Sequence, residues 1–120
     1  MEKNTIKIKR VYEAASTADG YRVLVDRLWP RGLKKSNVVM DEWNKEIAPS
    51  TDLRKWFGHK PENFVRFSER YRAELKTKGD ELKRLRSIAL KQNLTLLFAA
   101  KDEKINHAIV LQKVLKQGKP

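Results

Sequence analysis

Two continuous apolar runs limit the fold of this 120-residue chain more than any other feature. They are Val23-Leu24-Val25 and the segment Leu94–Ala100, which is interrupted only by Thr95. A strand that lacks a polar face is covered on both sides, which is typical of the inner strands of a mainly parallel α/β sheet. Residues 5–11 instead alternate between apolar and lysine side chains, so we expect a further strand with one solvent-facing side at a sheet edge.

Helical spacing of apolar residues accounts for most of the remaining chain. Residues 51–57 are predicted to form a short helix between an N-cap at Ser50 and a stop at Gly58, with Leu53, Trp56 and Phe57 on its buried side. Longer helices are predicted over residues 61–78, 81–90 and 103–117. The expected signals at their ends are Pro61, an N-cap at Asp80, an N-cap at Asp102 and a stop at Gly118.

Strands that alternate with helices predict one α/β layered domain over residues 1–120, with a small, largely parallel sheet flanked by helices. The connection between the first two strands has only about eight residues, whereas a parallel crossover normally needs about a dozen or more. The sequence therefore leaves open whether these two strands run parallel or antiparallel.

Composition narrows the classes of function. The chain has no cysteine, which excludes disulfides, thiolate metal sites and thiol catalysis, and its two histidines give no reason to expect a metal or a cofactor. No run approaches the roughly 20 apolar residues of a membrane span, and no apolar stretch follows the N-terminus as in a secretory signal. We therefore expect a cytoplasmic protein without membrane contact.

Charge indicates the kind of partner. The chain has 27 Lys and Arg residues against 15 Asp and Glu residues, a formal net charge of +12. An excess of positive charge favours phosphates, nucleic acid or other polyanions. The sequence thus predicts a small anionic ligand, with nucleic acid as the alternative partner, and it gives no indication of the oligomeric state.

Both apolar runs change abruptly to charged residues at their carboxyl ends, where ligands bind in open α/β sheets. Asp26 and Arg27 follow the first run, and Lys101 and Asp102 follow the second. If the two strands are parallel neighbours, these four side chains meet in one cleft. His107 follows closely and is a candidate general base that Asp26 or Asp102 could orient. The alternative is that the charges only mark where the chain meets water and that His107 is structural.

Two further segments contain candidate ligand-binding residues. Arg27 and Arg31 flank Trp29, and arginine is suited to bidentate binding of phosphate or carboxylate. Trp29 could stack on a planar ligand, or it could hold the loop to the core. Arg54 and His59 are the polar side chains of the short helix and its end, although a histidine after a glycine is more often a capping or hydrogen-bonding residue than a catalyst.

Several strings of the sequence belong together. They are GYRVLVDRLWPRG at 20–32, APS at 48–50, LRKWFGH at 53–59, RY at 70–71 with EL at 74–75, AAKD at 99–102 and NHA at 106–108. This combination resembles the YeaO-like family of small uncharacterised bacterial proteins, within the domain of unknown function 488, over about residues 6–115. The resemblance implies a compact cytoplasmic α/β domain whose motif residues surround a common cleft, and it implies no particular activity.

The chain departs from the broader family at three points. Broader relatives carry Asp-Val-Arg after a strand and Cys-His-Arg at a strand-to-helix segment, and the matching segments here are Val25-Asp26-Arg27 and Asn106-His107-Ala108. The cysteine and the arginine of the second segment are missing, which argues against shared thiol chemistry. Lys60 also stands where the family pattern leads us to expect an acidic residue.

The sequence therefore predicts a basic pocket for a phosphate-bearing small molecule such as a nucleotide. In this hypothesis Arg27, Arg31, Arg54 and Lys101 bind the anion. If the pocket is catalytic, His107 transfers protons with the help of Asp26 or Asp102. One alternative is a nucleic-acid-binding or regulatory module that uses the basic surface. Another is an interaction protein whose motifs serve packing only.

Overall fold

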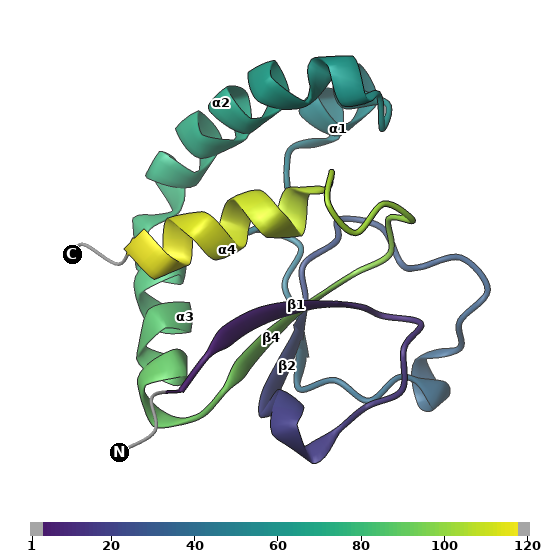
Figure 1. Ribbon diagram of the computed structural model, residues 1–120, viewed down its shortest axis with the longest axis vertical. Coiled ribbons are helices and arrows are strands. Elements are labelled where there is room, and N and C mark those ends of the chain that lie inside the picture. Colours follow the sequence, from purple (N-terminus) through teal and green to yellow (C-terminus); the bar gives the residue numbers. More distant parts are fainter. Residues whose placement is uncertain (1–3, 118–120) are drawn as a thin grey trace.

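Four parallel strands form one sheet in the computed structural model, which describes residues 4–117 (Figure 1). They are β1 (Ile6–Arg10), β2 (Tyr21–Leu24), β3 (Glu42–Trp43) and β4 (Leu94–Phe98), in the order β1-β4-β2-β3. The two apolar runs are therefore neighbouring inner strands, and the alternating strand β1 lies at an edge. The prediction of a small parallel α/β sheet is confirmed.

The direction of the first two strands is also settled. β1 and β2 both run parallel to β4, which lies between them, and Ile6 and Tyr21 are both paired with Leu94. The connection between them stays short because its only regular element is the 3-10 turn Thr17–Asp19. A helix is therefore not required for this parallel crossover.

Helices cover one face of the sheet (Figure 1). They are α1 (Thr51–Phe57), α2 (Phe64–Leu75), α3 (Gly79–Lys91) and α4 (His107–Gln117). Alternate residues of β4 point to this side, where Leu96 and Phe98 share a core with Phe67, Tyr71 and Leu111. None of the helices in residues 4–117 is both long enough and apolar enough to cross a membrane.

A loop layer covers the opposite face. Leu24 and Leu97 form a second apolar cluster there with Trp29 and Trp43, whose rings meet edge to face with centroids 5.2 Å apart. The apolar faces of β2 and β4 are thus buried under helices on one side and under this loop on the other.

The lysines of β1 lie on the loop side, and they are not simply solvated as the alternation had indicated. Lys7 and Lys9 reach the fully buried carboxylate of Asp19, at 3.0 and 3.1 Å, and Arg22 forms a further ion pair with it. This side of the sheet therefore carries an ion cluster around a buried carboxylate instead of a solvated face.

The predicted start at Pro61 is a 3-10 turn, Pro61–Asn63, and α2 follows it from Phe64. Two other predicted helix starts are wrong. α4 begins at His107, and its cap is the buried Asn106, whose Oδ1 accepts a hydrogen bond from the amide of Ile109 at 3.0 Å. The side chain of Asp102 instead closes a turn within the preceding loop, as aspartate often does. α3 begins at Gly79 and Asp80 provides no cap, because it already lies in the first turn. The expected stop at Gly118 lies outside the described residues.

The burial predicted for α1 is correct for Leu53 and Phe57 and wrong for Trp56. The first two residues are one turn apart and face the core, whereas Trp56 is 40% exposed. Its ring lies under the guanidinium of Arg70 on α2, 4.5 Å from the centroid. Trp56 is therefore a surface residue in a cation–π contact, and its removal is expected to cost far less than removal of a core aromatic.

Candidate functional site

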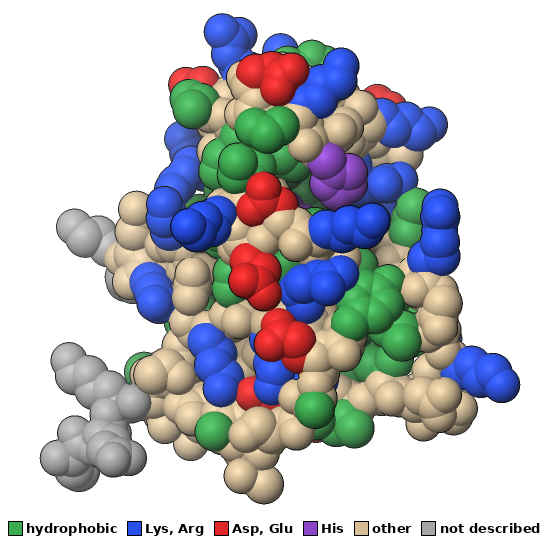
Figure 2. Space-filling view, turned by 45° about the vertical axis from the view of Figure 1, so that its right-hand side comes forward, with side chains coloured by type: hydrophobic (Ala, Val, Ile, Leu, Met, Phe, Trp, Pro, Cys, Tyr) green, Lys and Arg blue, Asp and Glu red, His purple; other side chains and the backbone are tan. Residues whose placement is uncertain are grey.

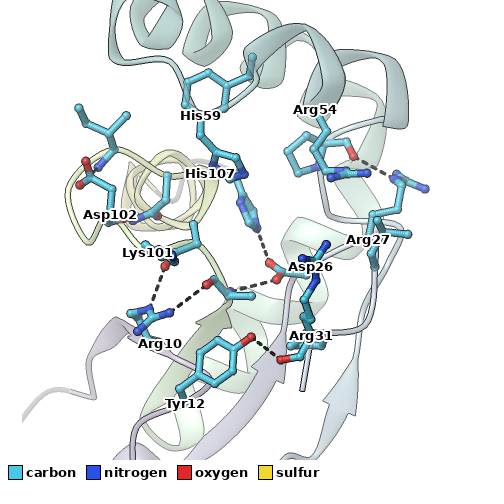
Figure 3. Close-up of a pocket in the computed structure, with 18 of the residues that line it drawn as sticks. Arg10, Tyr12, Asp26, Arg27, Arg31, Arg54, His59, Lys101, Asp102 and His107 are labelled. Carbon is cyan, nitrogen blue, oxygen red and sulfur yellow. Dashed lines mark hydrogen bonds and ion pairs between the residues drawn. The ribbon is translucent and has the colours of Figure 1, made fainter. Parts of the chain in front are cut away.

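A cavity of about 1040 Å³ lies at the carboxyl ends of β2 and β4 (Figure 3). Its wall comes from the end of β1, the loop after β2, α1 and its end, and the segment from β4 into α4. All nine residues singled out in the sequence line it: Asp26, Arg27, Trp29, Arg31, Arg54, His59, Lys101, Asp102 and His107. The structure thus brings together side chains that are up to 81 positions apart in the chain.

Asp26 lies where the two inner strands separate. Its Oδ2 accepts a hydrogen bond from the amide of Ala99 at 3.0 Å, which extends the ladder beyond the bond from Val25 N to Leu97 O. Its carbonyl accepts a hydrogen bond from the indole of Trp43 at 2.7 Å. Asp26 is therefore held firmly, with only Oδ1 left to face a ligand or a neighbour.

His107, the first residue of α4, is the neighbour of that oxygen. Its Nε2 lies 2.9 Å from Asp26 Oδ1 and 2.9 Å from the carbonyl oxygen of Val25. Both atoms are acceptors, so Nε2 carries a hydrogen. This hydrogen bond is directed to Val25, because Asp26 Oδ1 has no aligned hydrogen-bond partner in the part of the chain that the structure describes.

Asp102 does not orient His107, in contrast to one of the two arrangements that the sequence allowed. Its Oδ1 accepts hydrogen bonds from the amides of Lys104 and Ile105, at 2.8 and 3.0 Å. These two bonds lower the pKa of the Asp102 carboxyl, with the Lys104 amide as the larger cause. Asp102 therefore lies at the exposed margin of the cavity as part of its own turn.

Five cationic side chains line the cavity, and two of them are engaged by carbonyl groups. Arg10 donates from Nε to Ala100 O at 2.9 Å and from a terminal nitrogen to Ala99 O at 3.2 Å. Arg27 likewise donates to the carbonyls of Pro49 and Ala48, at 2.9 and 3.2 Å. Arg10 therefore joins the loop after β4 to the end of β1. Arg27 joins the segment before α1 to the loop after β2.

The other three cations are Arg31, Arg54 and Lys101, and they come from three different segments. Within residues 4–117, no hydrogen bond or ion pair engages their side chains. Arg31 and Lys101 are exposed, whereas the Nε of Arg54 is buried. These three side chains therefore have no donor in use within the described residues, whereas Arg10 and Arg27 keep their charge but use part of their donors on carbonyl groups.

Trp29 and His59 have structural contacts as well as a place in the cavity wall. The indole of Trp29 donates to Leu33 O at 2.6 Å, and its ring packs against Trp43, so it holds the loop to the second cluster. His59 has a left-handed backbone, with φ of 58°, and its ring lies 5.9 Å from that of Phe57. The contacts of Trp29 agree with its structural alternative, whereas the contact of His59 is with an aromatic ring and not a cap or a hydrogen bond.

Arg10 and Tyr12 also line the cavity, and the sequence reasoning missed both. The Tyr12 hydroxyl donates to Arg31 O at 2.8 Å, and the Arg10 guanidinium lies 4.8 Å from the centre of the Tyr12 ring. A signal was available, because Arg10 ends a strand that is parallel to β4. The strand-end argument applied to β1 would have included them.

The cavity offers cationic and polar groups to a ligand. In the described ranges, no three His, Asp or Glu side chains are grouped so that they could hold a metal ion.

Comparison with known proteins gives the family. The model of the inactive DUF488-N3 subclade matches residues 5–119. The chain is 56% identical over 106 residues to the uncharacterised protein YeaO of Escherichia coli K12, which covers 88% of this chain and 92% of that protein. It is 37% identical over 115 residues to the uncharacterised protein Rv3073c of Mycobacterium tuberculosis H37Rv, with 96% and 97% covered. No solved structure matches the chain. The family indicated by the sequence strings is confirmed, and the chain belongs to the inactive DUF488-N3 subclade.

Proposed function

We propose that the cavity binds a small phosphate-bearing molecule and that the protein is a binding protein rather than a catalyst. The observation that carries this proposal is the set of unengaged cations, Arg31, Arg54 and Lys101, around one cavity. Of the two carboxylates in the wall, Asp102 is bonded to its own loop and Asp26 to the Ala99 amide. The wall has five cationic side chains against these two carboxylates, so positive charge exceeds negative charge, and an anion balances it.

The size and lining of the cavity favour an organic phosphate over inorganic phosphate. Its volume of about 1040 Å³ is at the upper end of the range in which drug-sized ligands are bound. Tyr12, Leu28, Phe57 and Ile105 contribute apolar surface to the same wall. A ligand with a phosphate and a larger body, such as a nucleotide or a sugar phosphate, uses both kinds of surface.

Binding without turnover is supported by two observations. The family model is described as an inactive subclade. In addition, the Nε2 of His107 is bonded to the Val25 carbonyl, and the Asp102 carboxylate is bonded to amides of its own loop. The cytoplasmic location expected from the sequence belongs to the same proposal.

Replacing Arg31 tests the site without disturbing the fold. Because its side chain is exposed and makes no hydrogen bond in residues 4–117, we expect Arg31→Ala to keep the wild-type melting temperature. We expect it to weaken binding of the best phosphate-bearing ligand by about tenfold, the value of one charge-assisted contact. The ligand is first selected by a thermal-shift screen of nucleotides and sugar phosphates, and affinities are then measured by calorimetry.

The matched control is Arg66→Ala on α2. Arg66 is 68% exposed and has only a loose contact with Glu69, at 3.8 Å. The Arg66→Ala substitution removes one positive charge outside the cavity, so the affinity of this variant for the ligand should equal that of the wild type. An equal loss of affinity in both variants would show that net charge, rather than the cavity, attracts the ligand.

Nucleic acid stays the alternative partner, and the face drawn in Figure 2 gives it less support. Figure 2 shows Lys and Arg side chains scattered on this face among acidic and hydrophobic ones, without a continuous basic stripe. We therefore expect oligonucleotide binding to be weak and to disappear between about 50 and 200 mM salt, because it depends on non-specific phosphate contacts. Fluorescence anisotropy checks this, and tight oligonucleotide binding that persists at 200 mM would favour the nucleic-acid function instead.

A further inference from the structure

Two buried side-chain atoms have no aligned hydrogen-bond partner in residues 4–117, although one of them lies 2.9 Å from His107 Nε2, and both belong to residues of the cavity wall. They are Nε of Arg54, which is a donor, and Oδ1 of Asp26, which is an acceptor. Buried polar atoms are almost always paired, so each exception requires an explanation. Both residues line one cavity, where a bound molecule could supply the missing partners.

Asp26 Oδ1 requires a donor. Its partner oxygen Oδ2 is already bonded to the Ala99 amide, and the nearby hydrogen of His107 Nε2 is directed to Val25 O. A phosphate near this carboxylate would be repelled, whereas a hydroxyl group can donate a hydrogen bond to it. The ligand therefore presents a hydroxyl group, and not its charge, to Asp26.

Arg54 Nε requires an acceptor. A guanidinium group has no acceptor atom and is suited to the paired oxygens of a phosphate. Arg31 and Lys101 are the other unengaged cations of the wall. The phosphate of the ligand therefore belongs at Arg54.

Building on the proposed function, we propose that the ligand is a hydroxylated phosphate monoester, the chemistry shared by sugar phosphates and ribonucleotides. Its phosphate accepts hydrogen bonds from Arg54, and one of its hydroxyl groups donates to Asp26 Oδ1. Both side chains line the cavity. The cavity then discriminates by hydroxyl content as well as by charge.

Two probes of similar length separate these contributions. Ribose 5-phosphate has hydroxyl groups and n-pentyl phosphate has none, and calorimetry gives the affinity of each. We expect the wild-type protein to bind ribose 5-phosphate at least tenfold more tightly. Asp26→Asn should weaken ribose 5-phosphate binding about tenfold and leave pentyl phosphate within twofold. Arg54→Gln should weaken both, and the control Arg66→Gln should change neither.

The outcomes separate this inference from the proposed function. If ribose 5-phosphate, pentyl phosphate and every organic phosphate of the screen all fail to bind, the proposed function itself fails. If both probes bind the wild-type protein equally well, the cavity binds phosphate but does not recognise a hydroxyl, and this inference is overturned. It is also overturned if Arg54→Gln affects neither probe. Should Asp26→Asn fail to fold, the comparison of the two probes on the wild-type protein still decides.

Discussion

Replacement of Asp19 by asparagine is expected to lower the free energy of unfolding by about 3–5 kcal/mol, the usual cost of removing one partner from a buried ion cluster. The Asp19 side chain is fully buried and pairs with Lys7 at 3.0 Å, Lys9 at 3.1 Å and Arg22. It also accepts a hydrogen bond from the amide of Ser16 at 3.0 Å. An amide has no charge to balance the cations, and the side chain of Arg22 is itself buried.

Urea denaturation measures this loss, and Glu69→Gln serves as the control. Glu69 is a carboxylate on α2 that is 68% exposed, with only the 3.8 Å contact to Arg66. We expect that variant to differ from the wild type by less than about 0.5 kcal/mol. A loss below about 1 kcal/mol for Asp19→Asn would mean that the cluster contributes no more than a surface ion pair.

The same cluster predicts how stability depends on pH. Burial by itself raises the pKa of Asp19, but hydrogen bonds from Lys7, the Ser16 amide, Lys9 and Arg22 outweigh it and hold the pKa well below the usual range. A carboxyl with a lowered pKa contributes all its stability above its unfolded pKa, near 4, and loses it as the pH falls toward the folded pKa. The wild-type protein should therefore lose stability below about pH 4 more steeply than Asp19→Asn.

The inner sheet could be predicted because its signal is local. The uninterrupted apolar runs at Val23–Val25 and Leu94–Ala100 identify strands that are buried on both faces, and these strands are neighbours. Asp19 has no such signal. Before Gly20 it is a typical turn residue, and its burial depends on cations from β1 and β2.

The residues that line the cavity could be predicted from one rule, that parallel strands place their carboxyl ends at the same edge of the sheet. The role of each cation could not be predicted in this way. Arg27 and Arg31 look equivalent in the sequence, but only Arg27 meets the carbonyls of Ala48 and Pro49. Which arginine is free depends on the path of a distant loop, which no local pattern encodes. For the same reason the capping of α4 by Asn106 instead of Asp102 could not be predicted from spacing.

Gly20→Ala is expected to have an effect as large as that of Asp19→Asn, although it adds only a methyl group. Gly20 has φ of +64°, and a Cβ atom there would lie 2.1 Å from the carbonyl oxygen of Asn93. That oxygen also accepts the hydrogen bond from the amide of Tyr21 at 2.8 Å, where β2 and β4 begin to pair. Alanine must displace this backbone, so we expect the free energy of unfolding to fall by about 3–5 kcal/mol from the combined clash and left-handed conformation.

Gly32→Ala is the matched control, because Gly32 has φ of +82° but no atom within 4 Å of the added Cβ. Urea denaturation of that variant should show only the conformational cost of about 1–2 kcal/mol. Equal losses in the two variants would mean that backbone conformation alone, and not the close approach of Gly20 to Asn93, limits this position.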